Sequence, residues 1–122
     1  MRKVIAWVTG HVAEGLRTWL EASKSELQVT FCDSQEAVEA VLHDAGQEPP
    51  VIVAWLPYKQ AEQRVIAAVA EQVPGSPLVL FGFVGKNLLI EPFQNGNGRI
   101  AYFVSGETTM NEMVAAIEAA AK

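Results

Sequence analysis

The sequence contains little cysteine and no cluster of basic residues. Its 122 residues include one cysteine, Cys32, so no disulfide can form within the chain, and a reducing compartment is expected. Cys32 ends an apolar run, a position typical of a buried, inert thiol. Nine Lys and Arg residues are scattered among 14 Asp and Glu, for a net charge of −5. Because nucleic-acid binding depends on clustered basic residues, the composition predicts no nucleic-acid partner.

Long apolar segments are also missing. No run approaches the roughly 20 apolar residues of a membrane-spanning helix, and the first, Val4–Val8, is too short for a signal-peptide core. We therefore expect a cytoplasmic protein without a membrane partner. Half of the residues are hydrophobic and 19% are charged, as in globular proteins. This length predicts one domain, residues 1–122, around a single core.

Five short apolar runs, rich in β-branched and aromatic residues, divide the sequence. Nearly continuous runs of this kind are typical of strands that helices cover on both faces, as in a parallel sheet. The predicted strands are Val4–Val8, Leu27–Phe31, Val51–Trp55, Leu78–Phe81 and Ile100–Val104.

Segments with helical spacing lie between these strands. The second helix is expected over about residues 34–45, with Asp33 or Ser34 as its N-cap. Thr109 and Glu112 form a capping-box signature at the start of the last helix. The apolar stripe of the first helix is Leu16, Trp19 and Leu20. That of the third helix is Val65, Ile66, Val69, Ala70 and Val73, and that of the last helix is Met110, Met113, Val114 and Ile117.

Strand and helix thus alternate along the whole chain. Residues 84–99 predict a shortened fourth helix and a long turn, because Pro92 and the segment 94–98 (QNGNG) interrupt helical structure. Regular alternation favours right-handed βαβ crossovers. We therefore predict an α/β fold: a three-layer, doubly wound (βα)5 domain with a five-stranded parallel sheet in the flavodoxin-like order 2-1-3-4-5.

Several segments resemble the receiver domains of bacterial two-component response regulators. Residues 33–37 (DSQEA) are similar to the D-G-E-E-A start of the second helix in that family. Residues 51–57 (VIVAWLP) resemble its third strand and trailing Leu-Pro, and residues 73–80 (VPGSPLVL) resemble its proline-led fourth strand. Residues 101–104 (AYFV) are similar to the fifth strand, G-Y-L-L-K. The resemblance covers nearly the whole chain.

The resemblance also locates the positions that carry phosphorylation chemistry in receivers. The acidic pair that holds Mg²⁺ falls on Val8 and Thr9, and the phosphoacceptor aspartate falls on Val53, four residues before a proline. The Thr or Ser that closes the fourth strand falls on Gly82, and the lysine that closes the fifth falls on Ser105. All five positions therefore depart from the family pattern.

These departures predict the loss of phosphoryl transfer. Mg²⁺ requires hard oxygen ligands, chiefly carboxylates, and phosphoryl transfer to the domain requires an aspartate nucleophile with a metal to neutralise charge. Shifting the alignment by one or two residues places Ala54 or Trp55 at the acceptor position, again without a carboxylate. We expect a degenerate pseudo-receiver that is not an enzyme and holds no metal or cofactor.

The resemblance implies a function in signal transduction through protein–protein interaction. Receivers commonly bind partners through the face built from the fourth helix, fifth strand and fifth helix. In this sequence that face includes Tyr102, at the family's switching aromatic, and Asn87 and Ile90 in the fourth-helix segment. The expected partner is another protein or a second copy of the chain.

A second hypothesis places function at the loops after the strands, near Thr9, His11, Trp55 and Gly82. A small flavodoxin-like ligand-binding domain or enzyme would use these loops. Trp7 and Trp55 either fill the volume of the lost acidic pocket or line a small apolar ligand site. An open pocket at the strand ends would favour the second hypothesis, and an exposed apolar patch elsewhere would favour the first.

Residues 9–15 also resemble the first loop of mannose-type sugar phosphotransferase domains. The active histidine of that family aligns with Thr9, so the resemblance does not predict a catalytic histidine. A solvated position is expected for His11.

Overall fold

A computed structural model describes residues 3–8, 10–22, 26–44, 48–55, 60–73, 75–82, 100–104 and 110–121, and strands and helices alternate in it as far as residue 82. The first half contains β1 (Val4–Trp7), α1 (Gly10–Ala22), β2 (Val29–Cys32), α2 (Gln35–His43) and β3 (Val51–Trp55). The second half contains α3 (Gln60–Glu71), β4 (Leu78–Gly82), β5 (Ile100–Val104) and α5 (Met110–Ala121). The predicted strands are present with small differences at their ends.

The strands form a parallel sheet in which β1 and β3 are central. Val4 of β1 lies opposite Val29 of β2 on one side and Val51 of β3 on the other. β4 continues the sheet, with Leu78 opposite Ile52. The predicted α/β class and the parallel order β2-β1-β3-β4 are confirmed.

β5 pairs in parallel with β4 at the edge of the sheet, with Ile100 opposite Leu78. The predicted fourth helix falls within residues 84–99, which lie outside the described residues.

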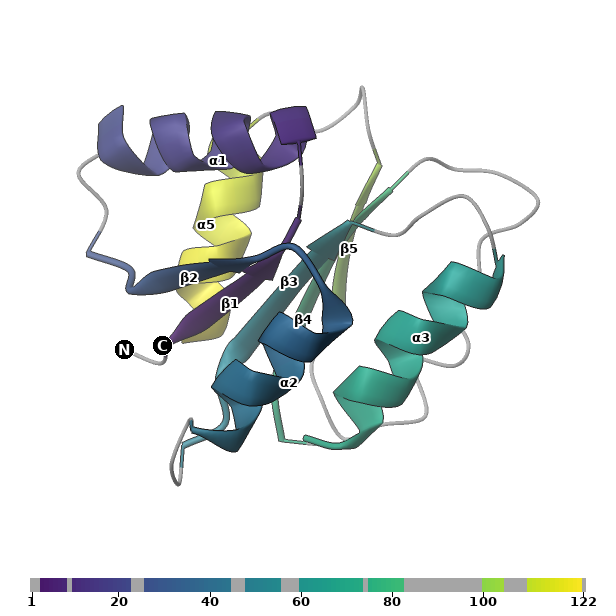
Figure 1. The fold of residues 1–122 in the computed structure, drawn as a ribbon. Coiled ribbons are helices and arrows are strands. Elements are labelled where there is room, and N and C mark those ends of the chain that lie inside the picture. The colour runs from purple at the N-terminus through teal and green to yellow at the C-terminus, as the bar shows by residue number, and fades with distance from the viewer. Residues whose placement is uncertain are drawn as a thin grey trace.

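Helices cover both faces of the sheet, as Figure 1 shows. α1 and α5 lie on one face, and α2 and α3 lie on the other. Strand residues alternate between these faces: Val53 belongs to the core cluster beneath α1 and α5, whereas Ile52 and Ala54 belong to the cluster beneath α3. Strands buried in this way explain the continuous apolar runs in the sequence.

Most of the predicted helix stripes face the sheet. The buried residues of these stripes include Leu16 in α1, and Val114 and Ile117 in α5. Thr109, the first residue of the predicted capping box, lies outside the described residues. Each described helix is too short or too polar to cross a bilayer.

The predicted stripe of α3 is wrong at one residue, Val65. Ile66 and Val69 are buried as expected, but Val65 is 39% exposed. The buried face of this turn is formed by Ile66, Ala67 and Val69. Val65 is rotated by roughly 100° from Ile66 and lies at the edge of that face. Val65 instead borders a pocket that Trp7 and Trp55 also line.

Candidate functional site

A pocket of about 550 Å³ opens at the carboxyl ends of β1 and β3. The chain leaves β1 into α1 on one face of the sheet and leaves β3 into α3 on the other. This divergence between neighbouring parallel strands is the topological switch point, where ligands bind in doubly wound folds. The volume is within the range of small-molecule sites, roughly 300–1,000 Å³.

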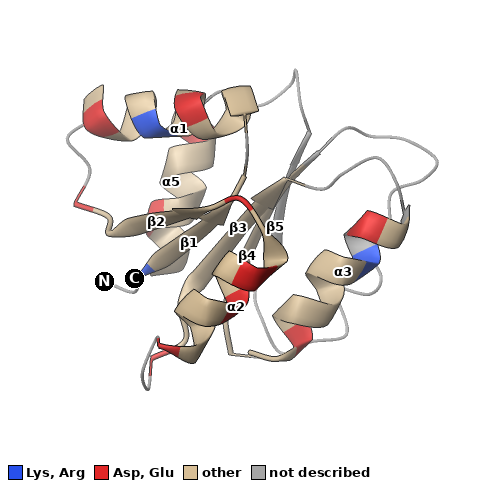
Figure 2. Cartoon of the chain, viewed as in Figure 1, with Lys and Arg blue, Asp and Glu red and all other residues tan. Residues whose placement is uncertain are grey.

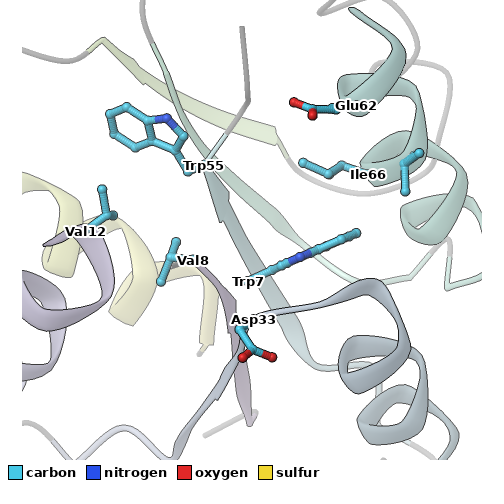
Figure 3. A pocket seen from close by; sticks show the side chains of 8 residues that line it. Trp7, Val8, Val12, Asp33, Trp55, Glu62 and Ile66 are labelled. Carbon is cyan, nitrogen blue, oxygen red and sulfur yellow. The ribbon is translucent and has the colours of Figure 1, made fainter. Parts of the chain in front are cut away.

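The two central strands supply an indole each to this pocket. Trp7 lies opposite Ala54 in the sheet, and Trp55 is the next residue along β3, so the two indoles leave the sheet on opposite faces. Trp7 packs against the core beneath α2 and α3, and Trp55 packs against the core beneath α1 and α5. Figure 3 shows the rings diverging in this way.

Both indoles are half-buried and line the pocket. The sequence offered two interpretations for them, filling a lost acidic pocket or lining a ligand site. In the structure, one part of each ring packs on a core cluster and another part borders the open volume.

Helices and one loop complete the walls. Val12 contributes from α1, and Glu62, Val65 and Ile66 contribute from α3 (Figure 3). Asp33 follows β2, which pairs with β1 on the side away from β3, and it lines the pocket from there. The pocket therefore combines two indoles and aliphatic side chains with two exposed carboxylates.

The sequence indicated that Trp7 and Trp55 either fill or line this volume, but it did not indicate Glu62 or Asp33 as residues of the site. The place of Glu62 could have been predicted from the sequence, because the first turn of a helix that follows a parallel strand lies near the carboxyl end of the sheet. Asp33 was considered only as a helix cap, and its place at the pocket depends on the pairing of β2 with β1.

The positions that the receiver resemblance assigns to phosphorylation chemistry do not all lie at the pocket. Val8 lines the pocket at 4% exposure, whereas Val53 is completely buried in the core cluster below it. The β3 residue that reaches the pocket is Trp55, two positions after Val53. Gly82 is the last residue of β4, and Thr9 and Ser105 lie outside the described residues.

Tyr102, one of the residues predicted to bind a partner, lies in the middle of β5, opposite Leu80 of β4. The structure describes its backbone position only. Asn87 and Ile90 lie outside the described residues.

A second hollow lies on the α1 side of β2 and shares Val8 and Asp33 with the pocket. The guanidinium of Arg17 lies 4.5 Å from the centre of the Phe31 ring, a cation–π contact. Cys32 also lines this hollow and is buried, as predicted. Burial and the nearby charge of Asp33 raise the pKa of the Cys32 thiol, so it stays protonated and weakly nucleophilic at neutral pH.

The histidines occupy exposed helical positions. His11, in the first turn of α1, has its Nδ1 atom 4.0 Å from Glu14 Oε2, and His43 ends α2. No three His, Cys, Asp or Glu side chains gather as a metal site within the described part of the chain. These positions give no geometric support to a histidine-based reaction.

The chain was compared with protein-family models, with curated proteins and with solved structures, and none of these comparisons found a match.

Proposed function

We propose that this chain is a receiver-like regulatory domain that acts by binding and not by phosphoryl transfer. The proposal includes the complete flavodoxin-like architecture, five βα units with sheet order 2-1-3-4-5. The observation that carries it is the apolar character of the central strand ends: Val8 and Val53 are buried, and the indole of Trp55 occupies the end of β3. Such side chains cannot ligate Mg²⁺ or accept a phosphoryl group.

The proposed role is protein–protein interaction in a bacterial, cytoplasmic signalling system. The binding face would include β5 with Tyr102, the segment with Asn87 and Ile90, and the outer side of α5. β5 is an edge strand, and α5 exposes Asn111, Glu112 and Ala115. The partner would be another protein or a second copy of the chain, bound without control by phosphate.

Incubation with acetyl phosphate and Mg²⁺ tests the absence of phosphoryl transfer. We expect no mass increase by intact-protein mass spectrometry, because the acceptor and metal positions hold no carboxylate. An active receiver domain in the same reaction is the positive control. A hydroxylamine-sensitive gain of one phosphoryl group would contradict the proposal and the alignment behind it.

The open pocket favours a second candidate function, binding of a small molecule at the strand ends. Among the described residues the exposed large hydrophobic side chain is Val65, and it borders this pocket. A thermal-shift screen of small molecules tests this candidate, since a ligand that binds only the folded state raises the melting temperature with its concentration. Substitution of Trp55 should remove the shift.

A further inference from the structure

The charge of the switch-point pocket indicates which small molecule would fit it. Among its described lining residues the ionisable groups are both acids, Asp33 and Glu62, and none is Lys or Arg. Figure 2 shows acidic residues on α1, α2 and α3 and few basic residues in the described part of the chain. An anionic ligand would therefore meet like charges at this site.

The two carboxylates lie on different elements and border the same apolar volume. Asp33 follows β2, and Glu62 lies in the first turn of α3. Figure 3 shows the Glu62 carboxylate directed from α3 toward the space between Trp7 and Trp55. Both side chains are exposed.

The two indoles also favour a positively charged ligand. The face of an indole ring attracts cations, and tryptophan does so more strongly than other aromatic residues. Val8, Val12 and Ile66 surround the rings with aliphatic surface, which suits the hydrocarbon part of a ligand. The site thus combines apolar surface, two indole rings and negative charge.

We infer that the pocket binds a small organic cation with an apolar or aromatic body, such as a protonated arylalkylamine. This inference rests on the ligand-binding candidate above and specifies the chemistry of its ligand. The ammonium group would lie between Glu62 and the indole faces, and the hydrocarbon part would contact Val12 and Ile66. A neutral ligand would lack the electrostatic attraction, and an anion would be repelled.

Three probes of similar shape test the charge requirement: phenethylammonium, neutral 2-phenylethanol and anionic 3-phenylpropionate. Binding is measured at pH 7 by calorimetry and by tryptophan fluorescence. A Trp19→Phe background removes the signal of the tryptophan in α1, which lies outside the pocket lining. We expect the amine to bind about tenfold more tightly than the alcohol, with no detectable binding of the acid, and the affinity for the amine to fall with added salt.

Substitutions locate the binding. Asp33→Asn and Glu62→Gln should each weaken amine binding about threefold and leave alcohol binding unchanged. Glu71→Gln, at the end of α3 and outside the pocket lining, is the matched control and should bind like the wild type. Because all three side chains are exposed, the variants should fold normally, as circular dichroism can verify.

The outcomes separate this inference from the candidate function on which it rests. Equal binding of amine and alcohol, or preference for the acid, would overturn the cation inference while supporting a ligand site. An amine preference that survives the double substitution Asp33→Asn/Glu62→Gln would also overturn it. Failure of all three probes to bind would overturn both the cation inference and the ligand-binding candidate.

Discussion

Val53 lies in the middle of the core and has no exposed surface. Its neighbours across the sheet are Ala6 of β1 and Val79 of β4, both completely buried. These neighbours offer no charged or hydrogen-bonding side chain. A carboxylate at this position would lose its hydration without gaining a partner.

We therefore predict that Val53→Asp lowers the free energy of unfolding by about 2–4 kcal/mol at pH 7. Burial would raise the pKa of the new carboxyl in the folded state above its unfolded value. The loss of stability should therefore shrink as the pH falls through that raised pKa, where the folded state holds the neutral acid. Urea unfolding at pH 7 and at acidic pH measures both effects.

Val53→Ala is the control for this prediction. It removes side-chain packing but introduces no charge, so its cost relative to the wild type should not depend on the titration of a buried acid. A Val53→Asp protein as stable as the wild type would contradict the buried position of Val53.

At the scale of elements, α2 begins with a side-chain cap. Ser34 has an extended backbone, and the Ala37 backbone N–H donates a hydrogen bond of 3.2 Å to Ser34 Oγ. Glu36 lies in the first turn, where its charge favours the helix dipole. The helix is nine residues long, too short to be stable by itself, so its cap and its packing through Val38 hold it on the sheet.

We predict that Ser34→Ala destabilises the protein by about 1 kcal/mol, because it leaves the first-turn N–H without its side-chain acceptor. Ser34→Asn is the matched variant and should retain most of the stability, since its side-chain oxygen can accept the same hydrogen bond. Chemical unfolding compares the two. An equal loss in both variants would show that the cap does not account for the effect.

At the scale of the whole molecule, the proposed regulatory role depends on association through the face that contains β5. Receivers shift between conformations when phosphorylated, but a domain without the acceptor has no such ligand to change its populations. Association should therefore depend on concentration alone. Tyr102 occupies the centre of this edge strand.

We predict that Tyr102→Ala weakens self-association or partner capture about tenfold, which corresponds to about 1.4 kcal/mol. Thr30→Ala, at an exposed position on the opposite edge strand β2, is the control. Sedimentation over a concentration series measures self-association, and circular dichroism checks that the fold is intact. Unchanged association in both assays would favour the ligand-binding candidate instead.

The sequence by itself determined the features that depend on local pattern. Continuous apolar runs predicted the strands, helical spacing predicted α1, α2, α3 and α5, and their alternation predicted the parallel α/β class. The sequence also narrowed the cap of α2 to two residues, of which the structure selects Ser34. Hydrophobic periodicity and backbone preferences can be read over a few consecutive residues, so this information is local.

Only the tertiary structure decided how these elements form a site. The register between β1 and β3 sets Trp7 opposite Ala54, which sends Trp7 and Trp55 to opposite faces and leaves Val53 below the pocket. The rotation of α3 turns Val65 to the pocket edge. Strand register and helix rotation are fixed by hydrogen bonds and packing between segments far apart in sequence, and those contacts alone bring Asp33 and Glu62 to one pocket.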